Sequence, residues 1–439
     1  MASAPRPPRL ARPIPVASPS RTRRGRLLEG LVLALLALSL AEALTLAAGG
    51  ALHGNDFKHL WAGAWLLAHG RSPYQPENLF KVARSFGWGA INPYVTLPTT
   101  GLLMRPLAAL DYGVAKQVWF WLNWALAWGV VLRGPGLLRV ARPGLARLAG
   151  AVFLAGAFPF FRQMTAGQMN VVMAALILGA GAALVRGRER WAGAALGLGV
   201  AWKISPALLI AALAVQGRRR AALWGLAVGA ALLLVSVALY GWPIHREALS
   251  VVRQMGYGQS TWASQNDFYR DPFNQSPNAL LHHLLTQNPY TTPWLHGTPA
   301  LADGLTVVVS LALGAAWLAQ ALRLRRRGQA RQAEMPLFLA ATLAMLLLPS
   351  LMWDHYVVQA LPALLWLFGS RGVARSPARV AGALAILLTL GVLWRHGAPA
   401  WSGGLGVPLM SLRLWPLLAL YGWLLYDPAL WADAPADKT

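Results

Sequence analysis

The chain has 439 residues, of which 56% are hydrophobic and only 12% are charged. Its 39 lysine and arginine residues far outnumber its 15 acidic residues, a balance that in a soluble protein indicates nucleic-acid binding. Apolar runs of about 20 residues recur along the chain, and each could cross the roughly 30 Å hydrocarbon core of a bilayer as a helix. The sequence therefore predicts an all-α polytopic membrane protein with no nucleic-acid partner, whose basic residues set its topology.

The N-terminal residues 1–26 are rich in proline, serine and arginine and offer no apolar face, so we expect a disordered basic cytoplasmic tail. The apolar run at about 27–50 is longer than the hydrophobic region of a signal peptide, which predicts an uncleaved first span. Residues 27–427 are expected to form a single multi-span domain, followed by a cytoplasmic tail at 428–439. The chain contains no cysteine and therefore has neither disulfides nor thiolate metal ligands.

Clusters of arginine mark the cytoplasmic ends of the spans, because short loops that carry lysine and arginine remain inside. Such clusters occur at 21–26, 133–147, 186–190, 218–220, 323–331 and 371–379. Apolar spans fit between them near 114–132, 148–162, 169–186, 221–241, 301–322, 335–350, 357–370, 378–395 and 411–427. Alternating these spans predicts about 10–12 membrane helices, two cytoplasmic termini, and external loops at about 51–113 and 242–300.

One segment, 191–216, lies between two cytoplasmic clusters but is too short for two complete spans. A re-entrant hairpin of two short helices, broken at Lys203-Ile204-Ser205-Pro206, resolves this conflict because proline cannot continue a regular helix. In the first external loop, apolar and aromatic residues recur at helical spacing over 56–67, which predicts an interfacial helix. The apolar segment 97–110 contains two prolines and is expected to pack at the same depth without crossing.

Polar residues embedded in apolar sequence are costly in a membrane and usually have a partner or a function. On the predicted topology they all lie at the external face, which indicates one site assembled from distant segments. The set comprises Asp56, Gln168, Asn170, Lys203, Asn274, Gln275, Ser276, Asn278, Asp354 and His355.

Members of this set also have purely structural explanations. Asp56 could cap the interfacial helix through the free amides of its first turn. Gln168 and Asn170 could bridge neighbouring helices by hydrogen bonds. Lys203 could extend to the lipid headgroups, and His355 could bond a backbone carbonyl.

A carboxylate, a lysine and a histidine at one membrane face suit the transfer of a sugar from a lipid phosphate to a hydroxyl. The carboxylate can accept the proton of an alcohol while a cation stabilises the departing phosphate. A transporter or lipid flippase could use the same residue types, but it would need ionisable residues near mid-depth on several spans. A non-catalytic envelope assembly protein is a third interpretation. Because the sequence has no phosphate-cradling glycine loop and no cluster of metal ligands, a lipid-linked donor is favoured and neither metal nor cofactor is expected.

Several short motifs follow one another between about residues 55 and 360, namely Asn55-Asp56-Phe57, Gly70-Arg71-Ser72-Pro73-Tyr74, Asn92-Pro93-Tyr94, Gly167-Gln168-Met169-Asn170, Trp202-Lys203-Ile204-Ser205-Pro206, Asn274-Gln275-Ser276-Pro277-Asn278 and Trp353-Asp354-His355-Tyr356. This ordered set resembles the polyprenyl-phosphate-mannose-dependent mannosyltransferases of glycosyltransferase family 87, which have the membrane fold called GT-C. The chain departs from the family at Asn92-Pro93-Tyr94-Val95, where a Tyr-Pro-Pro run is more usual.

The resemblance implies an inverting α-mannosyltransferase, or a related hexosyltransferase, at the external face of a bacterial inner membrane. Its partners would be a polyprenyl-phosphate sugar donor, a glycolipid or glycan acceptor, and membrane lipid. Asp56 would be the catalytic base, His355 would stand beside it or beside the phosphate, and Lys203 would contact the phosphate. The other candidate substrate-binding residues are Tyr74, Gln168, Asn170, Asn274, Gln275, Asn278 and Asp354.

Overall fold

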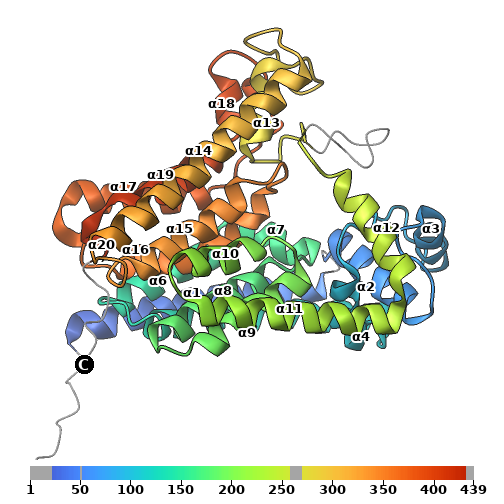
Figure 1. Cartoon of the computed structure of the whole chain (residues 1–439), viewed down its shortest axis with the longest axis horizontal. Coiled ribbons are helices and arrows are strands. Elements are labelled where there is room, and N and C mark those ends of the chain that lie inside the picture. Colours follow the sequence, from blue (N-terminus) through green and yellow to red (C-terminus); the bar gives the residue numbers. More distant parts are fainter. Residues whose placement is uncertain (1–21, 50–51, 258–268, 432–439) are drawn as a thin grey trace, which may run out of the picture.

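The computed structural model describes residues 22–49, 52–257 and 269–431, and this part of the chain is built from helices (Figure 1). Within these ranges there is no β-strand, only an isolated bridge between Asn274 and Trp353. The predicted all-α class is therefore confirmed. Most of the tails expected at 1–26 and 428–439 lie outside the described residues, so both tails stay predictions.

Helices follow one another closely along the described residues. In chain order they are α1 (Arg23–Ala48), α2 (Asn55–Ala68), α3 (Pro76–Ser85), α4 (Pro98–Ala108), α5 (Tyr112–Leu137), α6 (Pro143–Gly156), α7 (Phe158–Ala166), α8 (Asn170–Val185), α9 (Glu189–Trp202), α10 (Ala207–Val215), α11 (Arg219–Tyr240), α12 (Trp242–Arg253), α13 (Pro277–Leu285), α14 (Pro299–Arg326), α15 (Glu334–Leu347), η1 (Asp354–Ala360), α16 (Leu361–Gly369), η2 (Val373–Arg375), α17 (Pro377–Gly391), η3 (Pro399–Trp401), α18 (Gly406–Met410), α19 (Leu414–Tyr426) and α20 (Pro428–Trp431).

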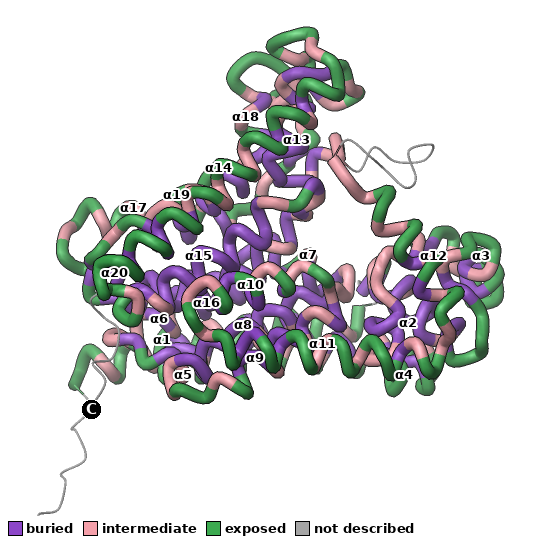
Figure 2. Tube along the Cα trace, in the orientation of Figure 1, coloured by how far each residue is buried: buried purple, intermediate pink, exposed green. Residues whose placement is uncertain are grey.

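Four helical segments in the described residues are long and apolar enough to cross a membrane: α1, α11, α14 and the run Asp354–Arg375. Three of them, α1, α11 and α14, bury little of their surface within the protein, and Figure 2 shows exposed residues along α11 and α14. Apolar side chains left uncovered along a whole helix are suited to contact with lipid. The run Asp354–Arg375 is instead mostly buried and lies inside the helix bundle.

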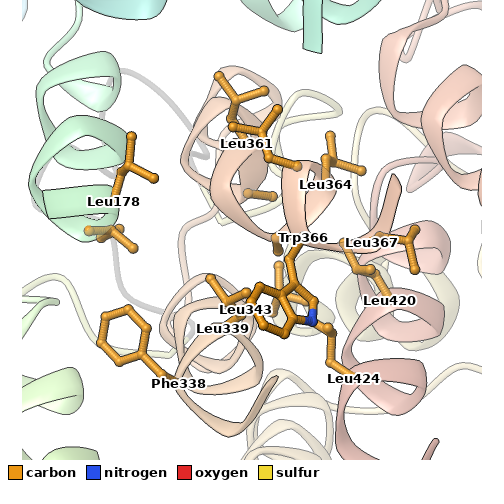
Figure 3. Packing of buried hydrophobic residues seen from close by; sticks show 14 of the residues in the cluster. Leu178, Phe338, Leu339, Leu343, Leu361, Leu364, Trp366, Leu367, Leu420 and Leu424 are labelled. Carbon is orange, nitrogen blue, oxygen red and sulfur yellow. The ribbon is translucent and has the colours of Figure 1, made fainter. Parts of the chain in front are cut away.

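The main hydrophobic core extends through much of the helix bundle, including α5, α6, α8 and the C-terminal helices. Figure 3 shows Trp366 of α16 among Leu339 and Leu343 of α15 and Leu420 and Leu424 of α19. All five side chains are buried, and an aromatic ring of this size dominates the packing of the region around it. This core fixes α16, and with it the preceding η1, relative to the rest of the bundle.

The predicted span 148–162 proves to be two helices. The chain bends by 59° between α6 and α7 at Ala157, and Pro159 occupies the first turn of α7. Proline is favoured in the first turn of a helix but cannot continue the helix that precedes it. The helix therefore breaks between α6 and α7. The bend carries α7 toward η1 and α2 and away from the axis of α6.

The predicted hairpin at 191–216 is confirmed as two short helices. α9 ends at Trp202, Lys203 is extended, and α10 begins after Pro206. Gly193 and Gly197 of α9 lie against the backbone of α11, where a side chain larger than hydrogen would clash. Such small residues allow two helices to pack closely in a membrane protein. The hairpin is therefore held firmly with Lys203 at its turn.

The segment 56–67, which is expected to be external, forms the predicted helix, but α2 is more enclosed than a helix lying alone on a membrane surface. Most of its residues are buried in a second hydrophobic cluster with α3 and α4. Tyr94 fits against Gly63 and Gly101, which leave room for its ring between α2 and α4. Figure 1 shows α2, α3, α4 and α12 gathered at one end of the molecule, while α13 and α18 form a separate projection.

Candidate functional site

Asp56 stands in the first turn of α2, at a point where the chain is fixed by its neighbours. Gly54 has a positive φ of 56° and occupies the N-cap position, and its amide donates to the carbonyl of Thr165 at 2.9 Å. The amide nitrogen Nδ2 of Asn92 donates to Oδ1 of Asp56 at 2.9 Å. Because Gly54 is the N-cap residue, the half-exposed carboxylate of Asp56 is not used as a side-chain cap of α2.

Lys203 and Tyr356 meet beside this carboxylate. The ammonium nitrogen of Lys203 lies 3.3 Å from the centre of the Tyr356 ring, a cation–π contact. Asp56 is close enough to act electrostatically on both side chains. Three segments that are far apart in the chain therefore bring a carboxylate, a cation and an aromatic hydroxyl to one place.

Two threonines of α4 hold the end of α9 that leads into Lys203. The hydroxyl of Thr99 donates to the carbonyl of Ala201 at 2.7 Å, and that of Thr100 donates to the carbonyl of Trp202 at 2.9 Å. The last carbonyls of a helix have no partner within the helix, so these bonds satisfy groups that would otherwise be buried and unpaired. They also fix the position from which Lys203 extends.

Asp354 is completely buried and lies among basic groups. Its Oδ1 is 2.6 Å from Nη1 of Arg162 and 3.4 Å from Nδ1 of His355, and its Oδ2 is 3.8 Å from Nε2 of His396. Burial lowers the pKa of His396 to about 4, so that imidazole is neutral near pH 7, and the nearest cation to Asp354 is Arg162. The guanidinium of Arg162 also stacks 4.1 Å from the centre of the Phe273 ring.

His355 is a buried side chain with unused hydrogen-bonding capacity. It is only 4% exposed; its Nδ1 lies 3.4 Å from Oδ1 of Asp354, whereas its Nε2 has no hydrogen-bond partner in the described part of the chain. Buried polar groups are normally paired, and an unpaired one is a common mark of a ligand site. The imidazole also packs edge-on against Tyr356, with ring centres 5.2 Å apart, so it lies next to the Lys203 contact.

Gln168, Asn170 and Tyr74 occupy different surroundings. Asn170 is fully buried and links two helices, because its Nδ2 donates to Gln163 at 2.8 Å and its Oδ1 accepts from Gln359 at 2.7 Å. Gln168 is half-buried in the turn that precedes α8. The hydroxyl of Tyr74 donates to the carbonyl of Thr96 at 2.7 Å. Within the described residues, the hydrogen bond to the Asp56 carboxylate comes from Asn92 and from none of these three side chains.

Asn274, Gln275 and Asn278 are each fully buried, and their amides bond within the protein. Nδ2 of Asn274 donates to the carbonyl of Ser350 at 3.0 Å, and its Oδ1 accepts from the amide of Met352 at 2.9 Å. These bonds hold the loop that leads into Trp353 and Asp354. The amide of Gln275 bonds the region around residues 410–413, and Nδ2 of Asn278 donates to Asp303 and Thr306.

Arg162 is not among the candidate residues predicted from the sequence, because it lies at the end of an expected span. It is a single arginine at the end of an apolar run, outside the arginine clusters that predict the cytoplasmic loops. Pro159, three residues earlier, was the signal that could have revealed a separate helix with a polar face. Tyr356 and Asn92, which contact Lys203 and Asp56, lie within the short motifs of the sequence, but the sequence predicts no role for them.

A family model described as Glycosyltransferase family 87 matches residues 97–353 of the chain. No curated protein and no solved structure gave a match. The matched region contains Thr99, Arg162 and Lys203, whereas Asp56 precedes it and His355 follows it.

Proposed function

The chain belongs to glycosyltransferase family 87, and from this membership we propose that it transfers a hexosyl unit, mannose in the first instance, from a polyprenyl phosphate to a hydroxyl group. The acceptor would be a glycolipid or a glycan at the external face of a bacterial inner membrane. The observation that carries the proposal is the convergence of Asp56, Lys203 and Tyr356 from three separate segments. A base beside a cation is the combination that displacement of a phosphate by an alcohol requires.

In this mechanism Asp56 is the general base. The acceptor oxygen attacks the anomeric carbon, its proton passes to Asp56, and the bond between that carbon and the phosphate oxygen breaks. Attack from the face opposite the phosphate inverts the configuration and gives an α-linked product from a β-linked donor. The bond that Oδ1 accepts from Asn92 fixes the carboxylate plane and leaves Oδ2 to receive the proton.

The leaving phosphate is stabilised by Lys203 and His355. The ring of Tyr356 packs against one face of the ammonium group, which leaves its remaining N–H donors for phosphate oxygens. His355 contributes Nε2, a buried ring nitrogen that lacks a partner within the described residues. The ammonium group of Lys203 neutralises charge that develops as the carbon–oxygen bond breaks, and the imidazole of His355 provides a hydrogen bond to the same phosphate, so their effect is greatest in the transition state.

The test is transfer of labelled mannose from polyprenyl phosphate to extracted membrane glycolipids by purified protein in liposomes. Asp56→Asn keeps the size and polarity of the side chain but removes the base, and transfer should fall at least about a hundredfold while the melting temperature is retained. Glu77→Gln is the matched control, because it neutralises an exposed carboxylate of α3 in the same external segment. If Asp56→Asn retains more than about half of the activity, Asp56 is not the general base.

A further inference from the structure

A basic pocket lies at the opposite end of α9 from Lys203, where α8 ends and both α9 and α11 begin. Its volume is about 380 Å³, and its lining consists of Gly187, Arg188, Glu189, Arg190, Trp191 and Arg220. α9 begins in this pocket and ends next to Lys203, and its 14 residues span about 21 Å. The pocket is therefore separate from the proposed catalytic site and lies toward the other membrane face.

The positive charge of this pocket is not neutralised from within. Glu189 is its acidic residue, and that carboxylate pairs with Arg218 at 3.1 Å. Arg218, which does not line the pocket, also pairs with Glu334. Both carboxylates therefore pair with the same arginine and not with an arginine of the pocket. Within the described ranges no carboxylate pairs with the exposed Arg188, Arg190 or Arg220, although Arg190 lies over the Trp224 ring.

The pocket lies at the boundary between water and lipid. α11 is one of the helices able to cross a membrane, and it begins at Arg219, beside the pocket. Just beyond, its outer face exposes Leu223 (65%) and Leu226 (60%), and Trp191 of α9 is 67% exposed. Tryptophan is enriched at this depth of a membrane, and apolar side chains exposed next to it are suited to acyl chains.

The two helix starts that carry the arginines are also held in a fixed arrangement. Gly193 packs against the backbone carbonyl of Ala221, and Gly197 packs against that of Gly225. Close backbone contact of this kind prevents α9 and α11 from moving apart without losing extensive packing. The three guanidinium groups therefore project from a rigid base, which reduces the entropy lost when they bind a common ligand.

We propose that this pocket binds the headgroup of an anionic phospholipid. The phosphate accepts hydrogen bonds from Arg188, Arg190 and Arg220, and the acyl chains lie along the exposed leucines of α11. Both features are needed, because the arginines alone would suit any phosphate, whereas the adjoining apolar surface suits only one attached to lipid chains. The proposal does not depend on the glycosyl donor or acceptor.

The experiment measures the melting temperature of purified protein in an uncharged detergent. Added phosphatidylglycerol should raise it by several degrees, on the order of the shift expected for a ligand well above its dissociation constant, while phosphatidylcholine should not. Arg188→Gln/Arg190→Gln/Arg220→Gln should abolish the shift. Arg323→Gln/Arg326→Gln/Arg327→Gln is the matched control, since it removes three exposed arginines from the last turn of α14 and the residue after it, and should keep the shift.

Direct counting of bound phosphatidylglycerol by native mass spectrometry gives a second readout. The single variants Arg188→Gln and Arg220→Gln each remove one exposed group and should weaken binding roughly fivefold. An equal shift in the triple variant and the wild type would overturn the proposal. A full shift with inorganic phosphate or glycerol phosphate alone would also overturn it, because the pocket would then recognise a free anion and not a lipid.

Discussion

Lys203 and Tyr356 are joined by a contact of 3.3 Å between the ammonium nitrogen and the centre of the aromatic ring. This contact connects the turn of the α9–α10 hairpin to the start of η1, so the two motifs that contribute a lysine and a histidine form one surface. Asp56 acts electrostatically on both partners from the first turn of α2. Substitutions can test separately the charge of Lys203 and the bonds that hold it in position.

The first prediction concerns the charge of Lys203. Lys203→Met keeps the apolar stem but loses the ammonium group. The kcat/KM for the donor should therefore fall about 10–100-fold, the range expected for a lost hydrogen bond to a charged group. Initial rates measured against donor concentration, with acceptor saturating, would show the change. Lys203→Arg keeps the charge and should retain more activity than Lys203→Met. Donor kinetics equal to wild type in Lys203→Met would instead support a lysine that only reaches the lipid headgroups.

The second prediction concerns the threonines that hold α9. Thr99→Val and Thr100→Val preserve shape but leave carbonyls of Ala201 and Trp202 without their hydroxyl donors, at a cost of about 1–3 kcal/mol each. If these bonds position Lys203, the donor KM should rise, and Thr99→Ser, which retains the hydroxyl, should restore it. The measurement combines melting temperature with donor KM.

A control for this pair is Thr342→Val. Its hydroxyl is fully buried but bonds the carbonyl of Phe338 within α15, far along the chain from α9. It should lower stability without changing the donor KM. A similar rise of donor KM in Thr342→Val and Thr99→Val would mean that the effect reports general destabilisation and not the position of Lys203.

Local patterns in the sequence were sufficient for much of this fold. The break before α10 was predictable because Pro206 cannot sit inside a helix, and α2 was predictable because its apolar residues recur at helical spacing. Both rules act over a few residues. They say nothing about which distant segment covers a helix, which is why the enclosure of α2 by α3 and α4 was not foreseen.

The candidate site illustrates the same limit. A polar residue in apolar sequence indicates that a partner exists, but not whether that partner is a ligand or another part of the chain. Asn274 looks the same as Lys203 by this criterion, yet its amide bonds backbone groups near residue 350. Arg162 is the opposite case: the sequence does not predict it as a site residue, yet it pairs with Asp354. That pairing depends on the bend at Ala157, which places α7 against η1.

The third prediction concerns topology, which rests on the arginine clusters. The external loop was expected to include Ser72, but that residue is only 7% exposed and bonds Glu247, so it is a poor site for labelling. Glu77 and Gln329 are exposed, and the natural chain has no cysteine. In intact cells an impermeant thiol reagent should label Glu77→Cys but not Gln329→Cys, and permeabilisation should expose the second. The reverse pattern would turn the predicted orientation around.

The fourth prediction concerns the buried pair between Arg162 and Asp354. Arg162→Met leaves the Asp354 carboxylate, which is 0% exposed, without its nearest cation, at a cost of about 3–5 kcal/mol in unfolding free energy. Asp354→Asn should also destabilise, because Arg162 then loses its charged partner. The double variant should be less destabilised than the sum of the two, by on the order of 1–3 kcal/mol, since the partners contact each other directly.

The readout for this cycle is the melting temperature, together with transfer activity per folded protein. If Asp354 serves mainly to hold α7 against η1, the activity of folded Asp354→Asn should stay within about tenfold of wild type, in contrast to the loss of at least about a hundredfold expected for Asp56→Asn. Additive destabilisation in the double variant would show that the 2.6 Å contact contributes no coupling. If folded Asp354→Asn keeps full stability but loses about a hundredfold in transfer activity, Asp354 and not Asp56 would be assigned as the base.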